Sequence, residues 1–304
     1  MKFAFISYNC DNLLILFLDE EVMQTANQTL SVAVITSTIG RAQLERAILS
    51  VKAQTYSCKH YVFVDGEQFR ADAKEILDKY PDVIAIYLPM NTGAGGWTNS
   101  SINAIAPFLV KEVAICYLDD DNWYEPNHVE QCVKTMNESG ADYVYALRNF
   151  YSPAEQFISK DTLESIGFYE NKLDNPYHFQ ISVNGQSLAM HTTAHKRHHI
   201  DTNCYMMRRE LAIGISRFWY SGIHNDTNVF NALVQFNVSH CCTKQFTVNY
   251  LYDLDKYDMG FILSVEKAFP SLSREEVRQL NYQVTAQKQQ QNLERHGGVY
   301  PWDK

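Results

Sequence analysis

Apolar residues follow two alternating spacings between residues 31 and 147. Residues 32–35 form a short continuous apolar run, typical of a buried strand, and the helical i, i+3, i+4, i+7 spacing follows at Leu44, Ala47, Ile48 and Val51. The alternation recurs and predicts further strands at 61–64, 83–88, 113–118 and 143–147, with helices at 69–80, 97–109 and 127–137. It therefore predicts an α/β domain with a mostly parallel, twisted, doubly wound sheet flanked by helices.

The pattern changes on both sides of this region. Residues 1–29 have no clear periodicity and are interpreted as an N-terminal extension, whereas residues 150–199 are irregular and aromatic and are expected to shape an acceptor site. A capping box at residues 273–276 predicts a last helix that continues to about Arg295, and we interpret the glutamine run at 287–291 as a solvated face of it. The expected domains are an extension (1–29), a main domain (30–255, with halves 30–148 and 149–255) and a C-terminal helical tail (256–304).

Composition narrows the class of protein. The chain has 304 residues, 46% of them hydrophobic, so it is long enough to bury a full-sized core. Its net charge is −9 and it has no long basic run, which argues against a nucleic-acid partner. Seven cysteines without a C-x-x-C pair favour a reducing compartment. The apolar stretch 13–18 is too short to span a membrane, so we expect a cytoplasmic protein, with peripheral association at the inner membrane face left open.

Polar and acidic residues follow several of the predicted strands. Asp119, Asp120 and Asp121 come directly after the strand at 113–118, and unpaired carboxylates are costly to bury. Small or polar residues also follow the three earlier strands, at 36–38, 65–66 and 91–93. Ligands of open α/β sheets bind beyond the carboxyl ends of the strands, so these loops predict one pocket and a Mg²⁺ or Mn²⁺ site. The alternative is an acidic turn before a helix that begins at Pro126.

Several of these segments resemble, in order, the motifs of family 2 glycosyltransferases, which have the GT-A fold. The resemblance covers about residues 31–253. It rests on Ile35-Thr36-Ser37-Thr38-Ile39-Gly40-Arg41, Ser50-Val51-Lys52-Ala53-Gln54-Thr55-Tyr56, Val62-Phe63-Val64-Asp65-Gly66, Asn91-Thr92-Gly93 with Asn99, and the D-x-D motif Leu118-Asp119-Asp120-Asp121 with Pro126.

The resemblance implies an inverting, metal-dependent transferase. It would move a sugar from a nucleotide-sugar donor, expected to be a UDP-sugar, to a hydroxyl of a glycan or lipid-linked acceptor, in surface polysaccharide synthesis. Mn²⁺ or Mg²⁺ would stabilise the departing diphosphate. The implied residues are Asp226 as catalytic base, Asp119 and Asp121 at the metal, Thr36, Thr38, Asp65, Asn91, Gly93, Asp119 and Asp120 at the donor, and Trp219, Asp201 with Thr202, and His224 at the acceptor.

Two departures from the family pattern stand out. Thr98 occupies a position where the family often has an arginine, so one donor diphosphate contact is either lost or supplied from elsewhere. The usual Glu-Asp pair is Asn225-Asp226, which retains the aspartate expected to act as the base.

Simpler interpretations stay open for several residues. Asp226 would also serve as the N-cap of a helix that starts near Thr227. Trp219 would equally suit core packing, and a metal site at His191 and His195 is disfavoured by the basic residues beside them.

Three rival functions are compatible with parts of the pattern. A sugar nucleotidyltransferase would need a glycine-rich basic loop after the first strand, where residues 36–41 have one glycine and no lysine. A phosphohydrolase would need its acidic motif on the first strand. A non-catalytic nucleotide- or sugar-binding module is the remaining alternative, and turnover of a donor would exclude it.

Overall fold

The computed structural model describes residues 29–193 and 198–304. The expected extension at 1–29 therefore lies almost wholly outside the described residues, and so does His195 of the histidine-rich segment.

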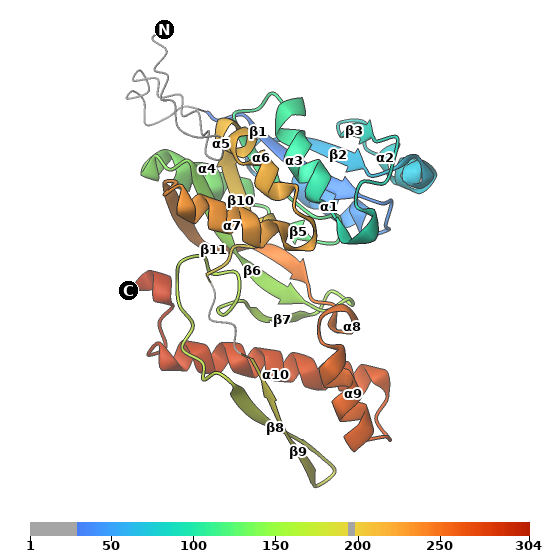
Figure 1. The fold of residues 1–304 in the computed structure, drawn as a ribbon, viewed down its shortest axis with the longest axis vertical. Coiled ribbons are helices and arrows are strands. Elements are labelled where there is room, and N and C mark those ends of the chain that lie inside the picture. Colours follow the sequence, from blue (N-terminus) through green and yellow to red (C-terminus); the bar gives the residue numbers. More distant parts are fainter. Residues whose placement is uncertain (1–28, 194–197) are drawn as a thin grey trace, which may run out of the picture.

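A nine-stranded sheet forms the centre of the protein (Figure 1). Its order is β3-β2-β1-β4-β10-β6-β11-β5, and β7 pairs with β6 beside this path. Strands β1 to β4, β6 and β11 run parallel, while β10 is antiparallel to both β4 and β6. The prediction of a mostly parallel α/β sheet is confirmed. The strands are β1 (Val32–Thr38), β2 (Lys59–Val64), β3 (Ile84–Tyr87), β4 (Ala114–Tyr117), β5 (Trp123–Tyr124), β6 (Tyr143–Tyr151), β7 (Phe157–Lys160), β10 (Tyr205–Arg208) and β11 (His240–Leu251).

Helices flank the sheet and connect its strands (Figure 1). The four helices predicted or implied by the apolar spacing up to residue 139 are present, with shifted ends; for example, the helix expected at 97–109 begins at Ser100. The α-helices are α1 (Leu44–Lys52), α2 (Arg70–Leu77), α3 (Ser100–Leu109), α4 (His128–Ser139), α5 (Arg209–Gly214), α6 (Ser216–Trp219), α7 (Asn225–Gln235), α8 (Leu254–Tyr257), α9 (Met259–Ala268) and α10 (Arg274–Arg295). None of the described helices is long and apolar enough to cross a membrane.

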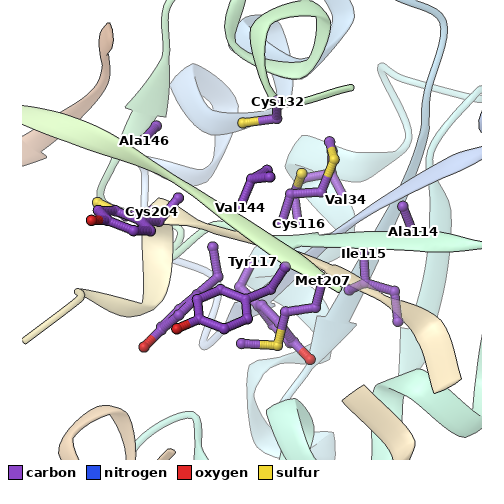
Figure 2. Close-up of a cluster of buried hydrophobic side chains, with 14 of the residues drawn as sticks. Val34, Ala114, Ile115, Cys116, Tyr117, Cys132, Val144, Ala146, Cys204 and Met207 are labelled. Atoms are coloured by element: carbon purple, nitrogen blue, oxygen red, sulfur yellow. The ribbon is translucent and has the colours of Figure 1, made fainter. Parts of the chain in front are cut away.

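The core lies where the central strands meet. Figure 2 shows Val34 of β1, Cys116 and Tyr117 of β4, Val144 of β6 and Met207 of β10 close together, all of them almost fully buried. This explains why these strands read as continuous apolar runs, since both faces of the sheet are covered. The six cysteines among the described residues are all free thiols, as the expectation of a reducing compartment requires of them.

A second layer packs beneath the sheet. It consists of the hairpin β8 (Tyr177–Val183) and β9 (Gln186–Thr192) and the helices α9 and α10, and Figure 1 shows α10 lying between the sheet and the hairpin. Ile181, Phe261 and Val277 belong to one apolar cluster that joins these elements. The sequence interpretation of 150–199 as irregular missed this hairpin. Its turn, Asn184-Gly185, has φ of 49° and 81°, the left-handed pair that this dipeptide favours in tight hairpins.

Helix α10 begins at the expected capping box, where Ser273 and Glu276 exchange hydrogen bonds. The interpretation of its glutamine run as solvated is wrong at one position. Gln289 is buried, and its Oε1 accepts from the backbone N–H of Thr162 at 2.7 Å and from the Thr162 hydroxyl at 2.8 Å. Asn292, one turn later, donates to the Thr162 carbonyl at 2.8 Å. The tail is therefore fastened to the segment that follows β7.

Replacement of Gln289 tests this attachment. Gln289→Leu leaves the buried Thr162 N–H and hydroxyl without an acceptor, which costs about 1–3 kcal/mol of unfolding free energy. Gln287→Leu is the matched control, because Gln287 is exposed on the same helix. Urea denaturation should show a lower midpoint for Gln289→Leu alone. Equal midpoints for both variants would contradict the assigned hydrogen bonds.

A second buried pair joins β1 to β2 and has a consequence for pH stability. The Thr36 hydroxyl lies 2.9 Å from Nε2 of His60, and burial lowers the pKa of His60 to about 3. Below about pH 6.5 His60 binds a proton in the unfolded chain but not in the folded chain, so the free energy of unfolding decreases as the pH falls.

We expect His60→Gln, whose amide nitrogen replaces Nε2, to remove that pH dependence. Relative to that of wild type, the free energy of unfolding of the variant should rise by about 2 kcal/mol when the pH is lowered from 7 to 5. Urea titrations at the two pH values measure it. His178→Gln, at an exposed histidine, should show no such shift, and a pH-independent difference for His60→Gln would refute the argument.

Candidate active site

A cavity of about 520 Å³ opens at the carboxyl ends of the parallel strands. This is where the sequence predicted a pocket. Loops after β1, β2, β3 and β4 reach it, together with the start of α7 and the end of β11. We call it the first cavity; the polar residues that line it are Ser37, Thr38, Arg41, Asp65, Asn91, Thr98, Asn99, Asp119, Asp121, Asn122, Asp201, Thr202, Asn225, Asp226, Tyr250 and Lys256.

Asp119 is held in place by two asparagines. Asn99 Nδ2 donates to its Oδ1 at 2.7 Å and Asn203 Nδ2 donates to its Oδ2 at 2.9 Å, while its own backbone N–H donates to Asn203 Oδ1 at 2.6 Å. Burial, reinforced by the charges of Asp121 and Asp201, raises the pKa of Asp119 to about 7. A carboxylate destabilised in this way gains from a nearby cation.

Asp121 lines the same cavity, whereas Asp120 does not. Asp120 is fully buried, accepts from the Thr38 hydroxyl at 2.6 Å and forms an ion pair with Arg41. The side chain of Asp120, which we expected at the donor, is turned inward and holds Arg41, so it acts on the cavity only through Arg41. Arg41 Nη1 also donates to Asp121 Oδ2 at 2.9 Å, so one guanidinium bridges both carboxylates.

Asp65 organises the loop after β3. Its Oδ1 accepts from the backbone N–H and the hydroxyl of Thr92, and its Oδ2 accepts from the N–H of Gly93 at 2.8 Å. A Cβ at Gly93 would lie 2.3 Å from the Thr98 carbonyl oxygen, so only glycine allows this close approach. Three of about four acceptor positions of the carboxylate are occupied, and Oδ2 retains one.

Asp226 lies in the first turn of α7, one residue beyond its start, so it is not the N-cap that the simpler interpretation expected. Its Oδ1 accepts from the N–H of Thr227 at 2.6 Å. Its Oδ2 lies 3.2 Å from Nε2 of His199, a histidine that is almost fully buried. Asp226 itself keeps about a quarter of its side-chain surface exposed, on the wall of the first cavity.

Besides Asp120, three of the expected site residues lie outside the first cavity. Thr36 is fully buried against His60. Trp219 is fully buried and packs on Tyr117, with ring centroids 5.0 Å apart, which confirms the simpler interpretation of core packing. His224 is exposed but does not line the cavity. The remaining expected residues do line it: Thr38, Asp65, Asn91, Gly93, Asp119, Asp121, Asp201, Thr202 and Asp226.

The sequence interpretation also missed residues that the structure brings to the site. Arg41 ends the first resemblance motif and carries the positive charge that Thr98 lacks. Asn225 Nδ2 donates to Asn99 Oδ1 at 2.7 Å, so it supports the asparagine that holds Asp119. His199 ends the irregular segment and Asn203 follows it, and no periodic pattern marked either residue.

The donor set suits a divalent ion of the magnesium type. Such ions are commonly bound by one or two carboxylates together with phosphate and water, and Asp119 and Asp121 are two carboxylates on one cavity wall. Within residues 29–193 and 198–304, no group of three or more histidine, cysteine, aspartate or glutamate side chains is arranged to hold a metal by itself. The substrate's phosphates would have to complete the site.

Residues 31–215 match the family model described as glycosyl transferase family 2. An uncharacterized protein of Haemophilus influenzae (strain Rd) is 33% identical over 108 residues, which are 35% of this chain and 69% of that protein.

Solved structures give a likeness at the level of the fold. S. aureus TarS 1–349 superposes with a TM-score of 0.50 at 12% identity, over 83% of this chain and 69% of that one. The same TarS fragment in complex with UDP-GlcNAc gives 0.51 at 11% identity, over 83% and 70%. Because the family model spans more than half of the chain, this protein belongs to glycosyl transferase family 2 and is a glycosyltransferase with the GT-A fold.

Proposed function

We propose that this glycosyltransferase moves a sugar from a UDP-sugar to a hydroxyl of a glycan or lipid-linked acceptor, with Mg²⁺ or Mn²⁺ and with inversion, in surface polysaccharide synthesis. The observation that carries the proposal is the meeting of Asp65, Asp119, Asp121 and Asp226 on one cavity, although they come from three separate segments of the chain.

The first cavity is suited to a nucleotide sugar. Its volume falls in the range of small-molecule sites, about 300–1,000 Å³. Asp65 Oδ2 is placed to accept from the N–H of a uracil ring, and the backbone near Thr38 lies beside it. The TarS fragment, similar in fold, is titled as a complex with UDP-GlcNAc, which supports a UDP-linked donor.

Two kinds of positive charge would act on the diphosphate. Asp119 and Asp121 would hold the divalent ion, which when bound offsets the negative charge that develops on the departing diphosphate. Arg41 lies on the same wall and is 42% exposed, so it is placed to supply the contact for which the family uses an arginine near position 98.

Asp226 would act as the general base. The acceptor oxygen forms a bond to C1 of the sugar while the bond between C1 and the diphosphate oxygen breaks, and the hydroxyl proton passes to the Asp226 carboxylate. The nucleoside diphosphate leaves on the opposite face, so this single displacement inverts the anomeric centre. The contact of its Oδ2 with Nε2 of His199 at 3.2 Å fixes one carboxylate oxygen and so favours one orientation of the base.

The donor assignment is tested with UDP-, GDP- and dTDP-sugars in Mn²⁺ or Mg²⁺, scored by nucleotide release. We expect release from a UDP-sugar, abolished by chelation and reduced on the order of 100-fold in Asp121→Ala, because Lewis-acid stabilisation is worth several kcal/mol. Asp78→Ala, at an exposed aspartate directly after α2 that does not line the cavity, is the control. Full activity of Asp121→Ala would contradict the metal assignment.

The base is tested with Asp226→Asn, which keeps the size of the side chain. We expect kcat to fall by about 10²–10⁴-fold, the usual contribution of a general base, with unchanged UDP affinity by calorimetry. A variant with wild-type kcat would show that another group accepts the proton.

A further inference from the structure

A second cavity, of about 400 Å³, adjoins the first. Both cavities are lined by Asp201, Asp226 and Tyr250, so these three residues form the wall between them. The proposed base therefore stands between two spaces, of which the first is suited to the donor.

The second cavity is built from both layers of the protein. Strands β6 and β11 contribute Arg148, Phe150 and Tyr250 from the sheet side, and Tyr252 follows directly after β11. The second layer, beneath the sheet, contributes Thr192 at the end of β9, Asp258 at the start of α9 and Lys288 of α10. Figure 1 shows α10 passing beneath β6 and β7. Since β11, α9 and α10 lie beyond residue 215, much of this wall falls outside the segment that matches the family.

The charges around the cavity disfavour an anionic ligand. Its described lining has four carboxylates, on Glu164, Asp201, Asp226 and Asp258, and two cations, on Arg148 and Lys288. Arg148 forms ion pairs with Asp161, Asp201 and Glu164 at 2.7–2.9 Å, so this cation and two of the four carboxylates are already engaged with one another, and Lys288 is left opposite Asp226 and Asp258. A phosphate entering here would face more negative than available positive charge, whereas carboxylates readily accept hydrogen bonds from hydroxyls.

The rest of the lining suits a sugar ring. Tyr250 and Tyr252, each partly exposed, add aromatic surface, while Thr192, Thr193 and His199 add hydrogen-bonding groups. Pockets that combine aromatic side chains with a few placed polar groups are typical of small-molecule sites.

We propose that the second cavity is the acceptor site and that it selects an uncharged glycan end, whose hydroxyl reaches Asp226 through the shared wall. This rests on the proposed function for its chemistry, but binding of the glycan is measurable without turnover. A phosphorylated or otherwise anionic acceptor is the alternative that the charges argue against.

The test uses the full chain saturated with UDP and Mg²⁺. Saturation-transfer NMR is recorded with a panel of neutral methyl glycosides and oligosaccharides and with their 6-phosphates. We expect neutral members to bind and their phosphates to bind at least ten-fold more weakly. Thr193 is exposed, and a tryptophan at this position would narrow the cavity. Thr193→Trp and Tyr252→Ala should each weaken binding of the neutral ligand by at least ten-fold. Lys267→Gln, at an exposed position of α9, serves as the control.

Separate readouts distinguish the two proposals. If calorimetry detects no binding of UDP, the donor assignment fails. The glycan panel, recorded without UDP, still reports on the second cavity. Binding restricted to phosphorylated glycans would overturn the neutral-acceptor assignment. Binding of neutral glycans that Thr193→Trp and Tyr252→Ala both leave unchanged, or no binding of any panel member, would overturn the cavity as their site.

Discussion

The buried guanidinium of Arg148 is the constraint on which the site's geometry depends. Removing a charge from water costs several kcal/mol, so Arg148 persists inside the protein only with its carboxylates in place. Asp161, one of them, also accepts from the backbone N–H groups of residues 163–165 and so fixes the segment after β7. Asp201, another, bonds Asn203, which holds Asp119. One buried charge therefore connects the segment after β7, to which α10 of the second layer is attached, to the D-x-D motif.

The part of the site that could be predicted from sequence lies at strand ends. Parallel strands bring their carboxyl ends to one edge of the sheet, so Asp65, Asp119 and Asp121 were placed correctly by pattern alone. Asp120 lies in a turn closed by the hydrogen bond from the Asn122 N–H to the Asp119 carbonyl, and its side chain is directed to Thr38 and Arg41 rather than to the cavity. The burial of Gln289, and the choice between the two interpretations of Trp219, depend on contacts between distant segments, which no local pattern encodes.

The C-terminal half was harder to predict for a different reason. Its hairpin packs on α9 and α10 rather than on the sheet, and aromatic residues obscure its alternation. The Asn184-Gly185 turn was the one local signal available. His199 and Asn203 could not have been found from spacing, because their roles arise only when the segment after the hairpin returns to pair with β4 and β6.

The position of Asp226 on the wall between two cavities bears on a side reaction. A space of about 400 Å³ holds roughly 13 water molecules at about 30 Å³ each. Water is itself a nucleophile, so with Asp226 as the proposed base, a donor bound without an acceptor would face hydrolysis with the help of the same carboxylate. The fraction of consumed donor molecules whose sugar reaches the acceptor therefore depends on how completely the acceptor displaces that water.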